Sequence, residues 1–492
     1  MSKKRNKDLD IIVSSLGGST NNVTGSCWSI SYPKDNGERG LIVIECGLIQ
    51  EGNTVKQQYN SNKRMIENIG KDIIDNAEYV LLTHSHVDHV GNLSIFNSNT
   101  NNFNGRILAS KKCIEISKEL IKDSVFIHTK NVESLKNNGE KVKPLYTEKD
   151  MYDMFSHMDY IEVGKEIKLN NNLTVIFNNN SHVVGSCNIK LIFRKPNNST
   201  KTIIYSGDIG SALNKDLTPY LENQFIPNKC NLFITEATYN DKERQITKQD
   251  VINERNELKQ YIKDSLCNGR RILFPTFAFG RSQTIATMIY DWFKDEEWFE
   301  NIPVVMDGYL MNNINSVYRR ILNNEDKEKF ENVLNWKNLI QNKSYDGTIA
   351  LLSERKVAIY IVSSGFMENG RITTYLPQFL GCSNDVIIST GYCGGEGSIG
   401  WKILNKNQKT ITIDKHTVLK RADIKQYKSF SSHITHDELL QLWSNIKCDK
   451  ILVHHSGKNK GEFISEAKEY LRNKNVTTNI VEVNKGSNQF VL

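Results

Sequence analysis

The sequence lacks long apolar runs and closely spaced cysteine pairs. Its 492 residues include no stretch of about eighteen consecutive apolar residues, the length that a membrane-spanning helix requires. The nine cysteines are scattered and never spaced C-x-x-C, which argues against a structural zinc ribbon and favours reduced thiols. The basic segment at residues 1–7 has no apolar stretch of the signal-peptide type behind it. We therefore expect a cytoplasmic protein with no membrane partner.

The composition is that of an ordinary globular protein. Hydrophobic residues make up 38% of the chain and charged residues 24%. A chain of 492 residues exceeds the usual size of a single core, so two domains are expected. The net charge of +7 is compatible with a polyanionic partner, but it does not identify one.

Two patterns of secondary structure follow one another along the chain. The first part is rich in expected strands, at residues 9–13, 27–32, 41–46, 79–82, 173–177, 189–193, 202–205 and 232–235. From about residue 245 helices alternate with expected strands, at residues 271–275, 303–306, 357–362 and 386–389, and a polar segment at 323–354 interrupts them. This alternation implies parallel βαβ units. Mixed strands and helices return after about residue 410.

The densest group of metal-ligand residues lies in the stretch 83–89, which reads T-H-S-H-V-D-H. His84, His86, Asp88 and His89 come directly after the expected strand at 79–82, on the loop at its end. Imidazole and carboxylate together suit zinc, or manganese with less preference. A polar loop that holds these residues by chance is the ordinary alternative, but chance seldom places such a group directly after a strand.

Further residues of the same chemical types also lie at or near strand ends. The first is Asp208, which lies between two glycines, and the second is Glu236, which ends the expected strand at 232–235. Three histidines complete the group, His182, His433 and His454. Each of these residues taken alone has an ordinary structural explanation, for example as a turn former.

Together, these residues resemble the motifs of the β-CASP nucleases, the nucleic-acid-processing branch of the metallo-β-lactamase superfamily. The resemblance runs from about Gly17 to His455 and includes the stretch at 272–281, I-L-F-P-T-F-A-F-G-R. It implies an α/β fold, a metallo-β-lactamase αββα sandwich with an inserted parallel-sheet α/β domain. The expected boundaries are 1–240 for the first part of the sandwich, 241–409 for the β-CASP domain and 410–492 for the completion of the sandwich.

The resemblance also assigns the metal ligands of two Zn²⁺ sites, with Mn²⁺ as the alternative. One zinc takes His84, His86 and His182, and the other takes Asp88, His89 and His454, with Asp208 bridging both. Of the adjacent pair His454 and His455, His454 is chosen because it stands directly at the end of the expected strand at 451–454. Glu45 stands where the family usually has Asp, and it is expected to support the metal ligands from behind.

The implied reaction is phosphodiester hydrolysis by a hydroxide held between two metals, leaving a 5′-phosphate and a 3′-hydroxyl. His433 is expected to protonate the leaving oxygen, and Glu236 to hold the His433 ring and keep it protonated. Arg281, Ser363 and Ser364 are expected to contact phosphate, although a helix-start arginine and turn serines explain them equally well.

The resemblance therefore implies a metal-dependent hydrolase, a ribonuclease acting on single-stranded RNA. Endonucleolytic cleavage is expected, with 5′-to-3′ exonucleolytic action as an addition. Three alternatives remain open: a small-molecule thioesterase or lactonase, a DNA nuclease, and an inactive scaffold paralogue. A histidine at the last motif favours RNA, because the DNA-repair branch carries a non-ligand there. Family members often dimerise, so a homodimer is a further expectation.

Overall fold

The structure is a computed structural model. It describes residues 9–17, 23–52, 54–215, 217–241, 246–414, 416–457, 459–483 and 488–492, so the basic segment at 1–7 lies outside the described residues. The chain divides into two compact units. Unit 1 comprises Met1–Ala212, Leu221–Gln245 and Ser432–Leu492, and unit 2 comprises Leu213–Tyr220 and Ile246–Ser431. The short helix α6 (Ala212–Lys215) lies at one of the junctions.

Unit 1 contains two seven-stranded mixed sheets. The first has the order β22-β1-β2-β3-β4-β5-β6, with bounds Gln489–Val491, Ile12–Gly17, Cys27–Pro33, Arg39–Ile44, Tyr79–Leu81, Arg106–Ser110 and Met158–Ile161. The second has the order β21-β20-β11-β10-β9-β8-β7, with bounds Asn479–Glu482, Lys450–Ser456, Leu232–Ala237, Thr200–Tyr205, Cys187–Arg194, Leu173–Asn179 and Ile167–Lys168.

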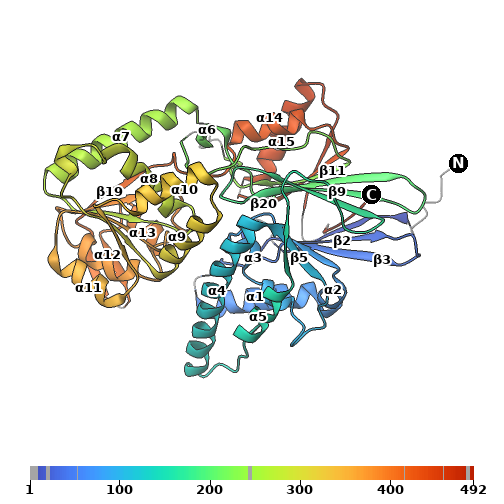
Figure 1. Cartoon of the computed structure of the whole chain (residues 1–492), viewed down its shortest axis with the longest axis horizontal. Coiled ribbons are helices and arrows are strands. Elements are labelled where there is room, and N and C mark those ends of the chain that lie inside the picture. The colour runs from blue at the N-terminus through green and yellow to red at the C-terminus, as the bar shows by residue number, and fades with distance from the viewer. Residues whose placement is uncertain are drawn as a thin grey trace. The chain divides into compact units, whose positions relative to one another are not determined.

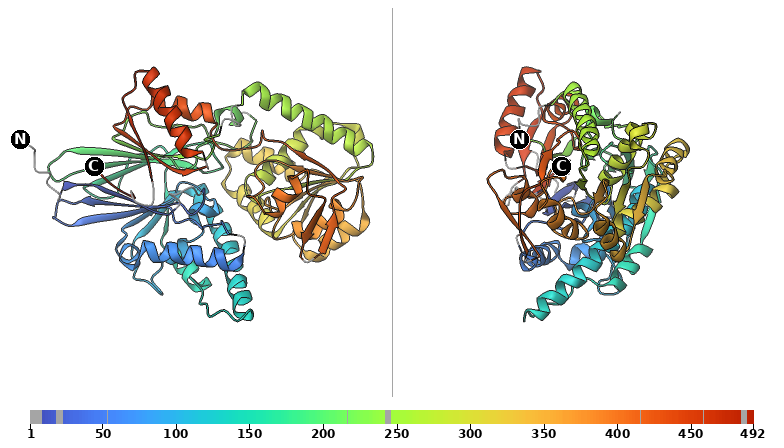
Figure 2. Two further views of the ribbon diagram at one scale, coloured as in Figure 1. Left: turned by 180° about the vertical axis from the view of Figure 1, so that it is seen from behind. Right: turned by 90° about the vertical axis from the view of Figure 1, so that its left-hand side faces the viewer.

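The two sheets pack face to face, and helices cover their outer faces (Figures 1 and 2). The first sheet carries α1 (Val55–Ile69), α2 (Lys71–Asn76), α4 (Lys111–Asn137) and α5 (Glu148–Ser156), and the second carries α14 (His436–Asn445) and α15 (Lys460–Asn473). A four-residue helix, α3 (Val87–Val90), and a 3₁₀ turn (Leu93–Ile95) follow β4. These layers form an αββα sandwich.

The burial pattern of strand β8 shows why the two sheets pack face to face. Leu173, Val175 and Phe177 are wholly buried in the core between the sheets, whereas Thr174 and Ile176 point to the other face and are half-buried. Successive side chains of a strand point to opposite faces, so alternate apolar residues give the strand one face for the inner core. The same core takes apolar residues from both sheets, which holds the sandwich together.

The direction of the strands decides where polar residues meet. Strands β3 and β4 are parallel in the first sheet, and β10, β11 and β20 are parallel in the second. Strand β8 runs in the direction of β10, because both pair with β9 in the antiparallel sense. In each sheet the loops that follow these strands therefore lie at one edge, and side chains from distant parts of the sequence meet there.

Unit 2 is built on a six-stranded parallel sheet of order β14-β13-β15-β12-β16-β19. The strands in that order are Leu339–Asn342, Val304–Asp307, Ile359–Val362, Ile272–Pro275, Val386–Ser389 and Asp423–Gln426. One face packs against α7 (Lys248–Cys267), α8 (Arg281–Phe293), α9 (Tyr309–Ile321) and α10 (Asn324–Leu334). The other face packs against α11 (Tyr345–Glu354), α12 (Ile372–Leu380) and α13 (Ile399–Leu404). A 3₁₀ turn (Glu297–Phe299) and a hairpin, β17 (Thr410–Ile413) with β18 (His416–Leu419), complete the unit.

Unit 2 ends later along the chain than the expected boundary at residue 409. Strand β19 pairs with β16 over four residues, from Val386–Asp423 to Ser389–Gln426, so it extends the parallel sheet. The structure thus places residues 410–431 in unit 2, whereas the boundaries implied by the family resemblance place them in the sandwich.

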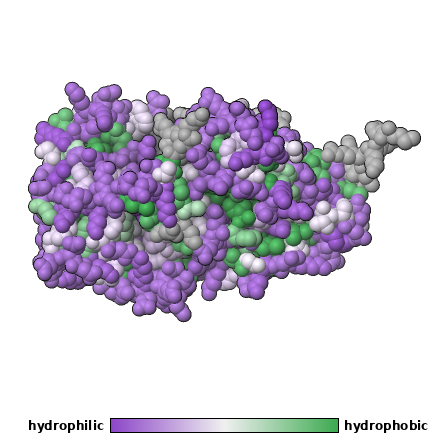
Figure 3. All heavy atoms as spheres, turned by 90° about the horizontal axis from the view of Figure 1, so that it is seen from above, coloured by the Kyte–Doolittle hydropathy of each residue, from purple (hydrophilic) through white to green (hydrophobic). Residues whose placement is uncertain are grey.

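Hydrophilic side chains cover most of the face drawn in Figure 3, and hydrophobic ones gather mainly in its middle part. None of the helices among the described residues is long and apolar enough to cross a membrane. Each of the nine cysteines is free.

Candidate metal centre

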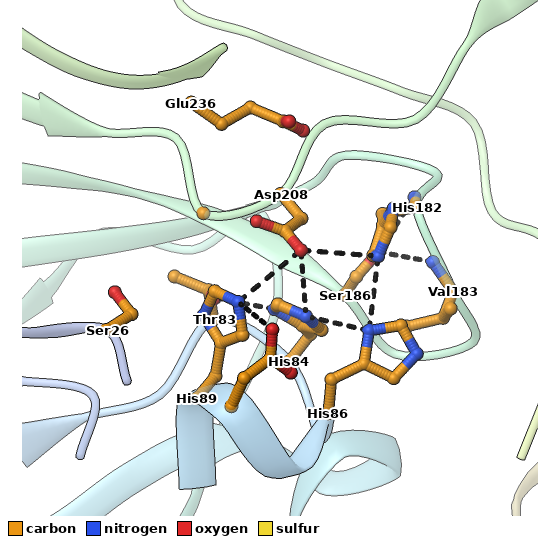
Figure 4. Close-up of polar contacts among 12 residues, drawn as sticks. Ser26, Thr83, His84, His86, His89, His182, Val183, Ser186, Asp208 and Glu236 are labelled. Carbon is orange, nitrogen blue, oxygen red and sulfur yellow. Dashed lines mark hydrogen bonds and ion pairs between the residues drawn. The ribbon is translucent and has the colours of Figure 1, made fainter. Parts of the chain in front are cut away.

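Three histidines and one aspartate converge at the edge of the sandwich where the parallel strands end (Figure 4). Ligand atoms of His84, His86, His182 and Asp208 lie within 4.8 Å of one another. Nδ1 of His86 is 3.1 Å from Nε2 of His84 and 3.2 Å from Nε2 of His182. Oδ2 of Asp208 is 3.6 Å from the Nε2 atoms of His84 and of His182. Four ligands that surround one zinc at about 2.0–2.1 Å would be about 3.3 Å apart, so these separations fit a single cation.

A second group of ligand atoms adjoins the first and shares Asp208. Asp88, His89 and His455 have ligand atoms within 4.8 Å of one another. Oδ2 of Asp88 is 3.7 Å from Nε2 of His89 and 3.5 Å from Nε2 of His455. The two oxygens of Asp208 face different histidines, with Oδ2 at 3.4 Å from Nε2 of His89 and Oδ1 at 3.3 Å from Nδ1 of His455. Asp208 thus contacts both groups.

The histidine of strand β20 in this second group is His455, so the assignment of His454 is corrected. Thr235 pairs with Val453 and Ala237 pairs with Ser456, so Glu236 alone lies opposite two residues of β20. This bulge, with His455 at a left-handed φ of +48°, turns the His455 side chain to the edge of the sheet.

The side chain of His454 lies instead in the core of the sandwich. Its ring contacts the rings of Trp28 and Tyr205, at centroid distances of 5.3 Å and 5.2 Å. Both ring nitrogens are buried, and neither has a hydrogen-bond partner in the described part of the chain. His454 is therefore a core side chain in this structure: its ring centroid lies 6.2 Å from that of His455, but it is not a member of either group of ligands.

Glu45 lies directly behind His89. The Glu45 side chain is wholly buried, and its Oε2 is 2.8 Å from Nδ1 of His89. Ser26 and Tyr205 donate hydrogen bonds to the same carboxylate at 2.6 Å and 2.7 Å, and Thr83 donates a third. With Nδ1 engaged by Glu45, Nε2 of His89 points at Asp208. The three hydroxyl donors were not identified from the sequence, because nothing in their spacing relates them to Glu45.

The charge states of the three imidazoles in the first group suit a cation. Burial lowers the pKa of His84 and His182 well below the ordinary value, and it lowers the pKa of His86 to about 4. These rings are neutral near pH 7, and a neutral imidazole offers a lone pair to a metal. Burial also disfavours the charged form of His89, but the carboxylates of Glu45, Asp208 and Asp88 outweigh it and raise the pKa of His89.

The carboxylates of Glu45, Asp208 and Asp88 thus hold a proton on the His89 ring, and a metal cation bound there could take over that positive charge. Nε2 of His89 is also buried, with no hydrogen-bond partner among the described residues. Both observations, together with the donor separations, show that the two clusters are able to hold metal ions.

His433 and Glu236 form a pair beside the ligand clusters. Nδ1 of His433 is 3.2 Å and 3.1 Å from the two Glu236 oxygens. Glu236 also accepts the backbone N–H of Ile209, next to Asp208, at 2.5 Å. Burial alone would lower the pKa of His433, but Glu236 and then Asp208 raise it to about 9. The ring centroid of His433 lies 4.5 Å from that of His182, so the charged imidazole adjoins the first group of ligands.

Gly47 permits the close backbone contact that positions Asp88 and His89. A Cβ atom at residue 47 would lie 1.5 Å from the carbonyl oxygen of Asp88. That carbonyl accepts the backbone N–H of Ser26, and the N–H of Cys46 donates to the carbonyl of His89. We expect Gly47→Ala to displace the loop and to reduce bound metal at least tenfold, measured as metal per chain after dialysis.

A matched control for this substitution lies in helix α15. Gly461 has no atom within 4 Å of a Cβ built on it, and alanine favours a helix over glycine by roughly 0.5–1 kcal/mol. Gly461→Ala should therefore keep its metal and unfold at the same temperature or slightly higher. Equal metal content in the two variants would show that the contact at Gly47 does not position the ligands.

The three residues expected to contact phosphate all lie in unit 2. Arg281 begins α8, and its Nη1 donates to the carbonyl of Thr390. Ser363 and Ser364 follow β15, and the Ser364 hydroxyl donates to the carbonyl of Asn369 at 3.0 Å. Arg281, Thr390 and the two serines thus follow the neighbouring strands β12, β16 and β15, at the carboxyl edge of the parallel sheet. Their contact with phosphate stays a prediction.

The chain is similar to one described domain family and to several proteins named as ribonucleases. Residues 282–403, within unit 2, match the family model described as the Beta-Casp domain. Ribonuclease TTHA0252 of Thermus thermophilus is 24% identical over 446 residues, covering 89% of this chain and 91% of that protein. The RNase J-like protein of Methanocaldococcus jannaschii is 22% identical, covering 85% and 87% of the two chains. Endoribonuclease YSH1 of Saccharomyces cerevisiae is 22% identical, but the match covers 78% of this chain and only 48% of that protein.

A solved structure shares the fold over nearly the whole chain. It is titled as a protein of unknown function from Enterococcus faecalis V583, has a TM-score of 0.55 at 13% identity, and is covered over its full length. The predicted fold class, a metallo-β-lactamase sandwich with an inserted β-CASP domain, is confirmed. The predicted resemblance to the β-CASP nucleases is confirmed as well, by the domain match together with the relatives named above.

Proposed function

We propose that this chain is a metal-dependent ribonuclease that hydrolyses phosphodiester bonds of single-stranded RNA. One observation carries the proposal: two groups of metal-type ligands share Asp208, and a histidine–glutamate pair stands directly beside them. Such an arrangement suits the cleavage of a phosphodiester, where negative charge must be balanced and a leaving oxygen must be protonated.

The ligand assignment follows the corrected geometry. His84, His86 and His182 would hold one cation, Asp88, His89 and His455 would hold the other, and Asp208 would contact both. We propose zinc for both positions, because mixed imidazole and carboxylate donors in this number suit it. Two such cations supply Lewis acidity to the phosphate oxygens and lower the pKa of a water molecule to near neutrality.

His433 is the group of the chain that would move a proton. Water attacks phosphorus and releases one proton to the solvent, the bond from phosphorus to the 3′-oxygen breaks, and the proton on His433 passes to that departing oxygen. The products are a 5′-phosphate and a 3′-hydroxyl. Glu236 accepts from Nδ1 of His433, so the proton available for transfer sits on Nε2. The raised pKa of His433, about 9, keeps the acid loaded at neutral pH.

The names of the relatives support RNA as the substrate. Three similar proteins are named ribonuclease, endoribonuclease and RNase J-like, and none of these names denotes a small-molecule hydrolase. The endoribonuclease supports internal cleavage, while 5′-to-3′ exonucleolytic action stays an additional proposal. A cytoplasmic location and a homodimer are likewise proposals that rest on the sequence.

The proposal is tested by cleavage of 5′-labelled and internally labelled single-stranded RNA, with a DNA of matched sequence alongside. We expect the wild-type chain to cut RNA to products with 5′-phosphates, and Asp208→Ala to lose cleavage by at least about 1,000-fold together with its bound metal. Asp159→Ala, which removes an aspartate at the surface of unit 1, is the matched control and should cleave normally.

The label pattern separates the two modes of cleavage. Internal fragments of intermediate length indicate an endonuclease, and release of single nucleotides from the labelled end indicates a 5′-to-3′ exonuclease. A zinc-loaded wild-type chain that cuts neither RNA nor DNA would overturn the proposal and favour a small-molecule hydrolase.

A further inference from the structure

An aromatic side chain follows each of five neighbouring strands in the parallel sheet of unit 2. Across the sheet the strands are β14, β13, β15, β12 and β16. In the same order, the aromatic residues are Tyr345, Tyr309, Phe366, Phe277 and Tyr392. Because parallel strands present their carboxyl ends at the same edge, these five residues lie at one edge of the sheet, and together they are called the aromatic row here.

Most of the aromatic row is exposed. The exposed fractions are 63% for Tyr309, 58% for Tyr345, 57% for Tyr392 and 40% for Phe277, and Phe366 is half-buried. Large aromatic side chains usually serve the core, and an aligned group at the surface marks a site of interaction.

The rings near the middle and one end of the aromatic row touch one another. The ring centroids of Phe277 and Phe366 are 5.0 Å apart, and those of Phe366 and Tyr392 are 6.0 Å apart, both in edge-to-face geometry. The ring of Phe277 lies over Gly365, where a Cβ would approach it to 3.0 Å. The rings are therefore ordered against each other and against the backbone, while 40% of Phe277 and 57% of Tyr392 stay exposed.

Two arginines accompany the aromatic row. The guanidinium of Arg371 lies 5.4 Å from the ring centroid of Tyr345, and Arg281 donates to the carbonyl of Thr390, two residues before Tyr392. Aromatic rings that stack bases, combined with cationic groups for phosphates, are the means by which proteins bind single strands without reading their sequence.

We infer that the aromatic row binds the bases of a single-stranded RNA by stacking, so that unit 2 holds the substrate of the proposed reaction. This inference rests on the proposed ribonuclease function and adds the residues that contact the bases. Binding by stacking tolerates any sequence, because every base has a stacking face. The row thus predicts an enzyme with little preference among the four bases.

Fluorescence anisotropy with a 5′-labelled single-stranded RNA tests the inference without requiring cleavage. The full chain carries Asp208→Asn throughout, so that the RNA stays intact. We expect Phe277→Ala and Tyr392→Ala each to raise the Kd about tenfold, since stacking on one aromatic ring is worth roughly 1–3 kcal/mol. Phe277→Tyr and Tyr392→Phe keep a ring and should keep the affinity.

The controls separate stacking from other effects. Phe126, 62% exposed on α4 of unit 1, lies outside the aromatic row, and Phe126→Ala should leave the Kd unchanged. An abasic strand of the same length keeps its phosphates, so Phe277→Ala and Tyr392→Ala should weaken its binding less than twofold. If all variants bind RNA equally well, the stacking role of the aromatic row is overturned, while the proposed function stands. The same holds if Phe277→Ala and Tyr392→Ala weaken binding of the abasic strand as much as binding of the intact RNA. A chain that binds no RNA at all overturns the proposed function too.

Discussion

Replacing His455 by alanine is expected to remove metal from the second group of ligands and to reduce RNA cleavage at least about 100-fold. His455 is the ligand-type residue of β20 that faces this group, at 3.5 Å from Asp88 and 3.3 Å from Asp208. Without it the group retains few donors for a cation that ordinarily takes four. Metal per chain, measured by mass spectrometry of the dialysed protein, and the rate of RNA cleavage check the expectation.

His454 provides the matched control for this prediction, because it is the adjacent residue and has the same side chain. Its imidazole is buried between Trp28 and Tyr205, and its nitrogens have no hydrogen-bond partner among the described residues. A buried polar group without a partner costs roughly 1–3 kcal/mol, so a leucine of similar volume should be neutral or stabilising. His454→Leu should therefore keep its metal and its cleavage activity, with a midpoint of thermal unfolding equal to or above that of the wild type.

The two substitutions together discriminate between the alternative assignments. If His454→Leu loses metal and His455→Ala keeps it, the ligand is His454, and the bulge in β20 does not exist as described. If both variants lose metal, the local fold of β20 rather than one ligand is responsible, and a lower unfolding temperature in both would show this.

The sequence alone does not determine which of these two histidines faces the metal ligands. The stretch 83–89 was informative because its ligand residues lie on one loop after one strand, so their convergence follows from local geometry. At β20 the outcome depends on a bulge, which arises from the pairing of two strands more than 200 residues apart. An unbroken strand would send residues 454 and 455 to opposite faces, and the sequence does not say which of them meets the edge.

The support of the metal ligands was predicted only in part. A position of Glu45 behind the metal ligands was expected from the resemblance, but its partner Ser26 immediately precedes β2 and its partner Tyr205 ends β10. Hydroxyl residues are common, and no pattern distinguishes those that face a buried carboxylate. Only the packing of the two sheets brings these groups together.

Most elements of unit 2 followed from the alternation of helices and strands, but the polar segment at 323–354 did not. It contains α10, β14 and α11. Strand β14 is at the edge of the sheet, and its residues Ile340 and Gln341 are exposed, so it has no apolar pattern to identify it. The aromatic row was missed for a related reason: its members lie in five separate loops, and only the order of the strands aligns them.

The second large effect is expected for His433. Alanine at this position removes the group proposed to protonate the 3′-oxygen, and general acid catalysis is worth about 10²–10⁴ in rate. His433 is not in either group of ligands, so His433→Ala should retain its metal while kcat for RNA falls by that factor. Glu236→Gln keeps the shape of the partner but removes its charge, so the pKa of His433 should fall. As the pH rises, activity should therefore decline from a lower pH than in the wild type, whose His433 keeps its proton up to about pH 9.

A modified substrate distinguishes proton donation from a merely structural role of His433. In an RNA whose scissile linkage carries sulfur in place of the 3′-oxygen, the departing thiolate is stable without a proton, since thiols are far more acidic than alcohols. His433→Ala should therefore cleave this linkage within about tenfold of the wild-type rate, while it cleaves the natural linkage far more slowly. A loss of the same size on both substrates would mean that His433 positions the neighbouring His182 ring, 4.5 Å away, and that another group supplies the proton.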